Sequence, residues 1–184
     1  MEKHEIKTRM WAMAGAEGLK LGLVSAGYMF ATLLLESCGM PAFVNTLVSF
    51  ILWSSKFAAC IYIMRFAMVK FAAIDSSINN RNTFHFGCAT ALLSAFVFSC
   101  ISFINVAYIS ADMYNEQIGL MMQQMAPMMD SNSLSMVDSY LERLPEITFI
   151  SNLIYCFAFG TVLSAILSRN IPSTDPFADY KPQE

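Results

Sequence analysis

Four long apolar segments dominate the sequence and constrain its fold more than any other feature. A helix that rises about 1.5 Å per residue needs about 20 residues to cross a hydrocarbon core of about 30 Å. Segments 42–64, 86–109 and 147–167 are each long enough, and Lys56 is the only charged residue in them. We therefore predict an all-α polytopic membrane protein.

The remaining apolar segment is shorter than a membrane span. Its uncharged part, Leu21–Leu35, holds only 15 residues, so a spanning helix must begin near Trp11 and include Glu17 and Lys20. We predict one domain of residues 1–184, with spans at about 11–35, 42–64, 86–109 and 147–167. An outer helical cap at 110–146 and a cytoplasmic tail at 168–184 complete it.

The composition excludes two broad classes of protein. Hydrophobic residues make up 56% of the chain and charged residues 14%, whereas a soluble domain carries about 25% charged residues. Too little polar chain remains for a soluble catalytic domain. The net charge is −3 and no dense basic stripe occurs, so we expect no nucleic-acid partner.

Lysine and arginine residues fall almost entirely on one side of the predicted spans. With the N-terminus inside, the cytoplasmic side receives nine of them and the outer side receives only Arg143. Basic residues mark cytoplasmic segments, so we predict that both termini and the Arg65–His85 loop are cytoplasmic. The nine basic residues are Lys3, Lys7, Arg9, Lys20, Arg65, Lys70, Arg81, Arg169 and Lys181.

Small residues recur at four-residue spacing within the spans. The first span has Gly18 and Gly22, the third has Gly87 and Ala91, and the last has Gly160. Faces without bulk let two helix backbones approach closely, which favours a compact four-helix bundle. The alternative is that one such face stays free for a helix of a partner protein.

Lys56 and Glu17 are the charged residues that stand out within the predicted spans. Counted from Ala42 and from Trp11, the two positions lie at about the same depth, about 9 Å from the inner boundary. We therefore predict a Glu17–Lys56 ion pair, either structural or used to handle an ion or substrate. In the structural alternative, Lys56 extends its ammonium to the inner surface beside Glu17.

The outer connection is predicted to form two amphipathic helices, and the first is rich in methionine. Met121, Met122 and Met125 recur at helical spacing. Thioethers are ligands for Cu(I), so copper binding is one interpretation. Methionine is also an adaptable filler of apolar helix faces, and we expect no metal and no cofactor.

No catalytic signature occurs, so we predict that the protein is not an enzyme. The sequence has no phosphate-binding glycine loop, no zinc-protease motif and no nucleophile elbow. The tail holds Pro172, Pro176 and Pro182 around Phe177 and Tyr180. Prolines prevent a helix, so the tail is either disordered or an extended peptide that docks on a partner through its two aromatic residues.

The whole chain resembles a small bacterial inner-membrane family known as domain of unknown function 4199. The resemblance is carried by Trp11, the stretch Gly18-Leu-Lys-Leu-Gly22-Leu, the four spans, the long outer connection and the short polar tail. It implies no established activity and no catalytic residues. It does imply that the protein accompanies a membrane-associated glycosyltransferase that uses polyprenyl-phosphate sugars.

We therefore expect a non-enzymatic accessory or scaffold subunit, with both termini in the cytoplasm of a bacterium. Its expected partners are the lipid bilayer and a protein, either such a glycosyltransferase or a second copy of the chain. The alternative is a small transporter or ion-handling protein that uses Glu17 and Lys56. Copper binding by the outer methionines is a third interpretation.

Overall fold

A computed structural model describes residues 3–38, 41–75, 78–125 and 131–171, and these ranges are almost entirely helical. Four helices are long and apolar enough to cross a membrane, which confirms the predicted fold class. The elements are α1 (Lys3–Ser37), α2 (Ala42–Ala72), α3 (Asn80–Ile104), the π-helical turn η1 (Asn105–Ile109), α4 (Ala111–Met125), α5 (Ser131–Glu142) and α6 (Leu144–Asn170).

α2 and α3 extend well beyond the predicted second and third spans. α2 continues past Met64 to Ala72, and α3 begins at Asn80, where the Asn79 side chain accepts a hydrogen bond of 3.0 Å from the Asn82 backbone N–H. The predicted Arg65–His85 loop is therefore mostly helical. Charges mark the end of the apolar segment, but on a helix Arg65 and Lys70 stay exposed while Met64, Ala67, Met68 and Phe71 are buried at helical spacing.

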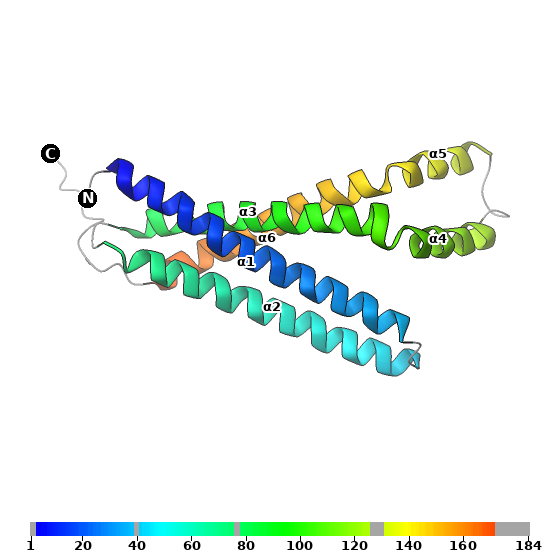
Figure 1. Cartoon of the computed structure of the whole chain (residues 1–184), viewed down its shortest axis with the longest axis horizontal. Helices are drawn as coiled ribbons and strands as arrows, with labels where there is room; N and C mark the ends of the chain where they lie inside the picture. Colours follow the sequence, from blue (N-terminus) through cyan, green and yellow to red (C-terminus); the bar gives the residue numbers. More distant parts are fainter. Residues whose placement is uncertain (1–2, 39–40, 76–77, 126–130, 172–184) are drawn as a thin grey trace.

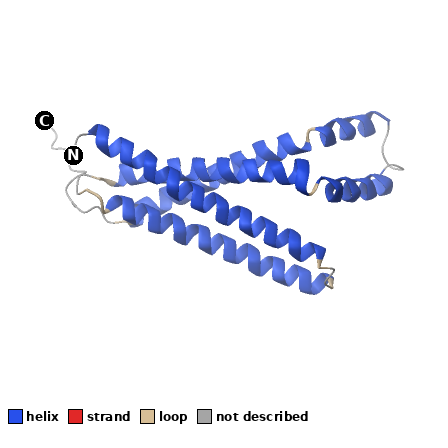
Figure 2. Ribbon diagram, in the orientation of Figure 1, coloured by secondary structure: helices blue, strands red, loops and turns tan. Residues whose placement is uncertain are grey.

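α3 lies at the centre of the bundle, packed between α1 and α6, whereas α2 packs mainly against α1 (Figure 1). We call the end where α1 and α3 begin and α2 and α6 end the terminal end. The opposite end, where α1 meets α2, is the distal end. The α1–α2 pair diverges from the α3–α6 pair toward the distal end (Figures 1 and 2).

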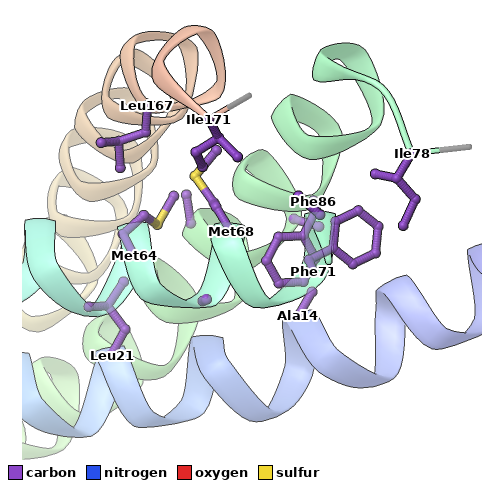
Figure 3. Packing of buried hydrophobic residues seen from close by; sticks show 13 residues of the cluster. Ala14, Leu21, Met64, Met68, Phe71, Ile78, Phe86, Leu167 and Ile171 are labelled. Carbon is purple, nitrogen blue, oxygen red and sulfur yellow. The ribbon is translucent and has the colours of Figure 1, made fainter. Parts of the chain in front are cut away.

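The core therefore concentrates near the terminal end, where all four spanning helices meet. Phe71 of α2 and Phe86 of α3 stack with ring centres 4.4 Å apart. Met64 and Met68 of α2 and Leu167 of α6 complete the cluster around them (Figure 3). The part of α2 beyond Met64 contributes four members of this cluster, which are Ala67, Met68, Phe71 and Ala72.

Small residues set the close packing of α3 against its two neighbours. An added Cβ would lie 2.9 Å from Leu93 Cβ at Gly18, 2.8 Å from Val97 Cβ at Gly22, and 2.5 Å from Ala91 Cβ at Gly160. At Gly87 it would lie 2.7 Å from the Ser164 hydroxyl oxygen. These small-residue faces are occupied within the bundle, so they are not free for a partner's helix.

α4 and α5 project from the distal end and do not fold back over the four spanning helices (Figure 1). α4 packs on η1, and α5 packs on α6. Tyr114 lies near the start of α4, where partial burial and, second, the negative charge of Glu36 raise the pKa of its phenol. Tyr114 at the beginning of α4 is therefore within electrostatic range of Glu36 at the end of α1, while the rest of α4 extends away (Figure 1).

A candidate intramembrane site around Lys56

A cavity of about 140 Å³ lies in the middle of the bundle and is lined by all four spanning helices. Its walls are mostly apolar and aromatic, with the hydroxyls of Ser25, Ser94 and Tyr155 and the thiols of Cys60 and Cys156 among them. Lys56 is the only charged residue among the described residues that line it. The cavity is therefore an apolar chamber with a single cation.

Lys56 points across the cavity to α3. Its ammonium lies 4.8 Å from the centre of the Phe98 ring, a cation–π contact worth about 2 kcal/mol when it is shielded from water. Lys56 follows Ala42 by 14 residues and precedes Ala72 by 16, so it lies about 21 Å and about 24 Å from the two ends of α2. Its ammonium lies over the Phe98 ring inside the bundle, and does not extend to the inner surface as in the structural alternative.

The predicted Glu17–Lys56 ion pair is wrong. The buried Glu17 carboxylate instead accepts a hydrogen bond of 2.8 Å from the Lys20 ammonium, one helical turn along α1. Among the described residues, Lys56 is in no ion pair. The charge in the centre of the bundle therefore has an aromatic ring, and no carboxylate, as its partner.

The pairing of α1 with α2 explains the error. Tyr28 and Ser55 share a hydrogen bond of 2.8 Å between their hydroxyls, and the Ser25 oxygen lies 3.7 Å from the Cys60 sulfur. These contacts place Lys56 level with the region of Tyr28, eleven residues and about 16 Å from Glu17 along α1. The depth estimate counted from Ala42 and from Trp11 across a core of about 30 Å, whereas α2 runs for 31 residues from Ala42, which is about 46 Å of helix.

The cavity can hold a small ligand that carries a negative charge or a hydrogen-bond acceptor. A charge inside a membrane protein marks a functional site by default when it faces the bundle interior. Among the described residues that line the chamber, none is a histidine or a carboxylate. The arrangement supports the binding of such a ligand.

A second cavity, of about 670 Å³, lies at the terminal end between α1 and α3. Lys7, Asn82 and His85 give it a polar side, and Met10, Trp11 and Leu92 are among its apolar lining residues. No pattern in the sequence pointed to it, because Lys7 and His85 are far apart in the chain and only the packing of α1 on α3 brings them to one cavity.

The other residues singled out in the sequence are placed as follows. On α4, Met121 is exposed and Met122 is half-buried, and neighbouring positions on a helix do not face each other. The side chain of Met125 and the tail residues Phe177 and Tyr180 lie outside the described residues. Within the described part of the chain, no group of three His, Cys, Asp or Glu side chains is placed to hold a metal ion.

Comparisons with known proteins give one family. No curated protein and no solved structure matches the chain. The model of the family described as "Protein of unknown function (DUF4199)" matches residues 18–169. That match runs from the glycine-rich part of α1 to the end of α6, across all four spanning helices and the α4–α5 projection, so the chain belongs to this family.

Proposed function

We propose that the protein is a non-enzymatic accessory subunit of a bacterial inner membrane and that it binds a protein partner through α4 and α5. The observation that carries this proposal is the apolar surface of the two projecting helices. Leu120 is 55% exposed, Met121 61%, Met136 69% and Tyr140 58%. In the part of the chain that the structure describes, these side chains lie on helices that pack on η1 and α6 at their bases and project beyond the bundle (Figure 1).

Apolar exposure has a different meaning on α4 and α5 than on the spanning helices. On α2, exposed residues such as Phe50 and Tyr62 face lipid in a membrane-embedded bundle. α4 and α5 lie beyond the candidate spans, where water would otherwise surround their apolar side chains. Amphipathic helices with uncovered apolar faces are typical of interaction surfaces.

The distribution of basic residues supports an orientation for this surface. Among the described residues, Lys7, Arg9, Arg81 and Arg169 lie in the parts of α1, α3 and α6 at the terminal end, and Lys20, Arg65 and Lys70 lie in the same halves of α1 and α2. The distal side has only Arg143, between α5 and α6. The positive-inside rule favours a cytoplasmic terminal end, which puts α4 and α5 outside.

A membrane-associated glycosyltransferase that uses polyprenyl-phosphate sugars is the partner that we propose, on the resemblance described above. The small-residue faces of α1, α3 and α6 are used within the bundle, so they do not serve as the contact. In this proposal the partner instead contacts the exposed apolar surface of α4 and α5. Phe177 and Tyr180 of the tail form a second contact on the cytoplasmic side.

A pull-down from native membranes in mild detergent tests this function. The full chain should retain a glycosyltransferase in a fixed ratio, and Leu120→Gln with Met121→Gln and Met136→Gln should lose it. Asn115→Ala with Gln117→Ala, at exposed polar positions of α4, is the matched control and should retain it. Recovery of the chain alone or as a homo-oligomer would reject the glycosyltransferase partner.

A second function, the handling of an anionic substrate within the membrane, is favoured by Lys56. In this proposal Lys56 acts alone in the central cavity, since Glu17 pairs with Lys20. Proteoliposomes that hold the wild-type chain should take up a member of a panel of small organic anions, and Lys56→Met should abolish uptake. Uptake that is equal for the two proteins would reject this function.

A further inference from the structure

We propose that the terminal-end cavity binds an anionic phospholipid, with its phosphate at Lys7 and His85 and one acyl chain between α1 and α3. The volume of about 670 Å³ is within the range of pockets that hold small organic ligands, about 300–1,000 Å³. A free phosphate ion would leave most of it empty. The inference is independent of the protein partner proposed above.

The polarity of the cavity walls changes along the bundle axis in the way an amphiphile requires. On α3, Asn82 and His85 come first, and Cys88, Ala89 and Leu92 follow over the next turns. Asn82 and Leu92 are ten residues apart, which is about 15 Å of helix. The polar residues are at the terminal end and the apolar ones lead toward the middle of the membrane.

α1 forms the opposite wall. Ile6 and Lys7 are at the terminal end, and Met10 and Trp11 follow them. Tryptophan is enriched at the boundary between lipid and water, so Trp11 places the polar side of the cavity at the level of lipid headgroups. Phe71 of α2 and Phe157 of α6 add apolar wall.

The charges of the cavity select an anionic lipid over a neutral one. Lys7 supplies a positive charge and His85 a ring N–H donor, and none of the described residues that line the cavity is acidic. Glu5, the nearest acidic residue in the sequence, pairs instead with Arg9 at 3.6 Å. Asn82 and His85 also lie in the first turns of α3, whose positive dipole end favours a phosphate.

Native mass spectrometry of the full chain, purified with equal amounts of dioleoyl phosphatidylglycerol and dioleoyl phosphatidylcholine, tests the site. A surface basic residue contributes about 1 kcal/mol toward anionic lipid, which is about fivefold in affinity. We expect at least that preference for phosphatidylglycerol in the wild type. Lys7→Gln with His85→Gln should reduce it to near unity. Arg65→Gln with Lys70→Gln removes two exposed charges outside the cavity and should reduce the preference less than the Lys7/His85 variant does.

Two further measurements distinguish lipid binding from the binding of another ligand and from misfolding of a variant. Leu92→Trp places bulk in the apolar part of the cavity and should reduce retention of phosphatidylglycerol while the unfolding temperature without lipid stays near that of the wild type. Millimolar inorganic phosphate should not displace the lipid. Equal retention of both lipids, an unchanged preference in the Lys7/His85 variant, or displacement by phosphate alone would overturn the proposal.

Discussion

The ammonium of Lys56 lies 4.8 Å from the centre of the Phe98 ring, in the middle of the bundle and without a carboxylate partner among the described residues. Placing a lysine at the centre of a membrane helix costs about 2.5–3.5 kcal/mol. A desolvated cation–π contact stabilises the charged lysine by about 2 kcal/mol. The ligand-free bundle therefore retains an uncompensated charge, which an anionic ligand would neutralise.

Replacement of Lys56 by methionine should consequently stabilise the ligand-free protein. We expect a gain of about 1 kcal/mol, the difference between the two contributions, measured by denaturant unfolding in lipid nanodiscs. Lys70→Met removes an exposed lysine from the last turn of the same helix and should change the stability by less than about 0.5 kcal/mol. A destabilised Lys56→Met variant would show that Lys56 holds the bundle together.

The partner of Glu17 can be identified by double-mutant cycles. Glu17 and Lys20 should couple by about 0.3–0.5 kcal/mol, because the Lys20 side chain is 62% exposed and solvent screens such a pair. Glu17 and Lys56 should not couple, since they are about 16 Å apart along the bundle. The coupling energies come from denaturant unfolding of the single variants Glu17→Gln, Lys20→Gln and Lys56→Met. Each is compared with the double variant that combines Glu17→Gln with Lys20→Gln or with Lys56→Met. A larger coupling to Lys56 than to Lys20 would contradict the observed pairing of α1 with α2.

Close packing of α6 on α3 predicts opposite effects for two glycine substitutions. A Cβ at Gly160 would lie 2.5 Å from Ala91 Cβ, whereas nothing lies within 4 Å of a Cβ at Gly27. Gly160→Ala should destabilise the bundle by about 1–3 kcal/mol. Gly27→Ala should leave it unchanged or stabilise it by up to about 1 kcal/mol through helix propensity. Thermal unfolding of both variants checks this, and equal effects would show that α3 and α6 do not pack as described.

The four spans could be predicted from the sequence because the length of an apolar segment directly limits what it can cross. Their ends could not, because Arg65 and Lys70 interrupt the apolar segment in sequence but lie on the exposed side of a continuing helix. The Glu17–Lys56 prediction failed because its depths were counted from Ala42 and from Trp11 across a core of about 30 Å. α2 is 31 residues long, about 46 Å, so the two positions do not lie at one level.

The candidate sites depend on contacts between helices, which a single sequence does not contain. Lys56 could be singled out as a charge in an apolar segment, but its position over Phe98 follows from the packing of α2 near α3. The placement of Lys7 and His85 at one cavity likewise has no signal in the sequence. The glycine at position 160 was predicted at a helix contact, but its partner Ala91 was identified only by the structure.

The most direct test of the proposed function is the yield of glycosyltransferase that co-purifies with the full chain from native membranes. We predict a fixed ratio for the wild type and for the Asn115→Ala/Gln117→Ala control. The ratio should fall at least tenfold when Leu120, Met121 and Met136 become glutamine, if their burial contributes about 1.4 kcal/mol or more in total. Equal recovery of the glycosyltransferase by all three proteins would show that α4 and α5 are not the contact. Its absence from the wild-type sample would contradict the accessory role itself.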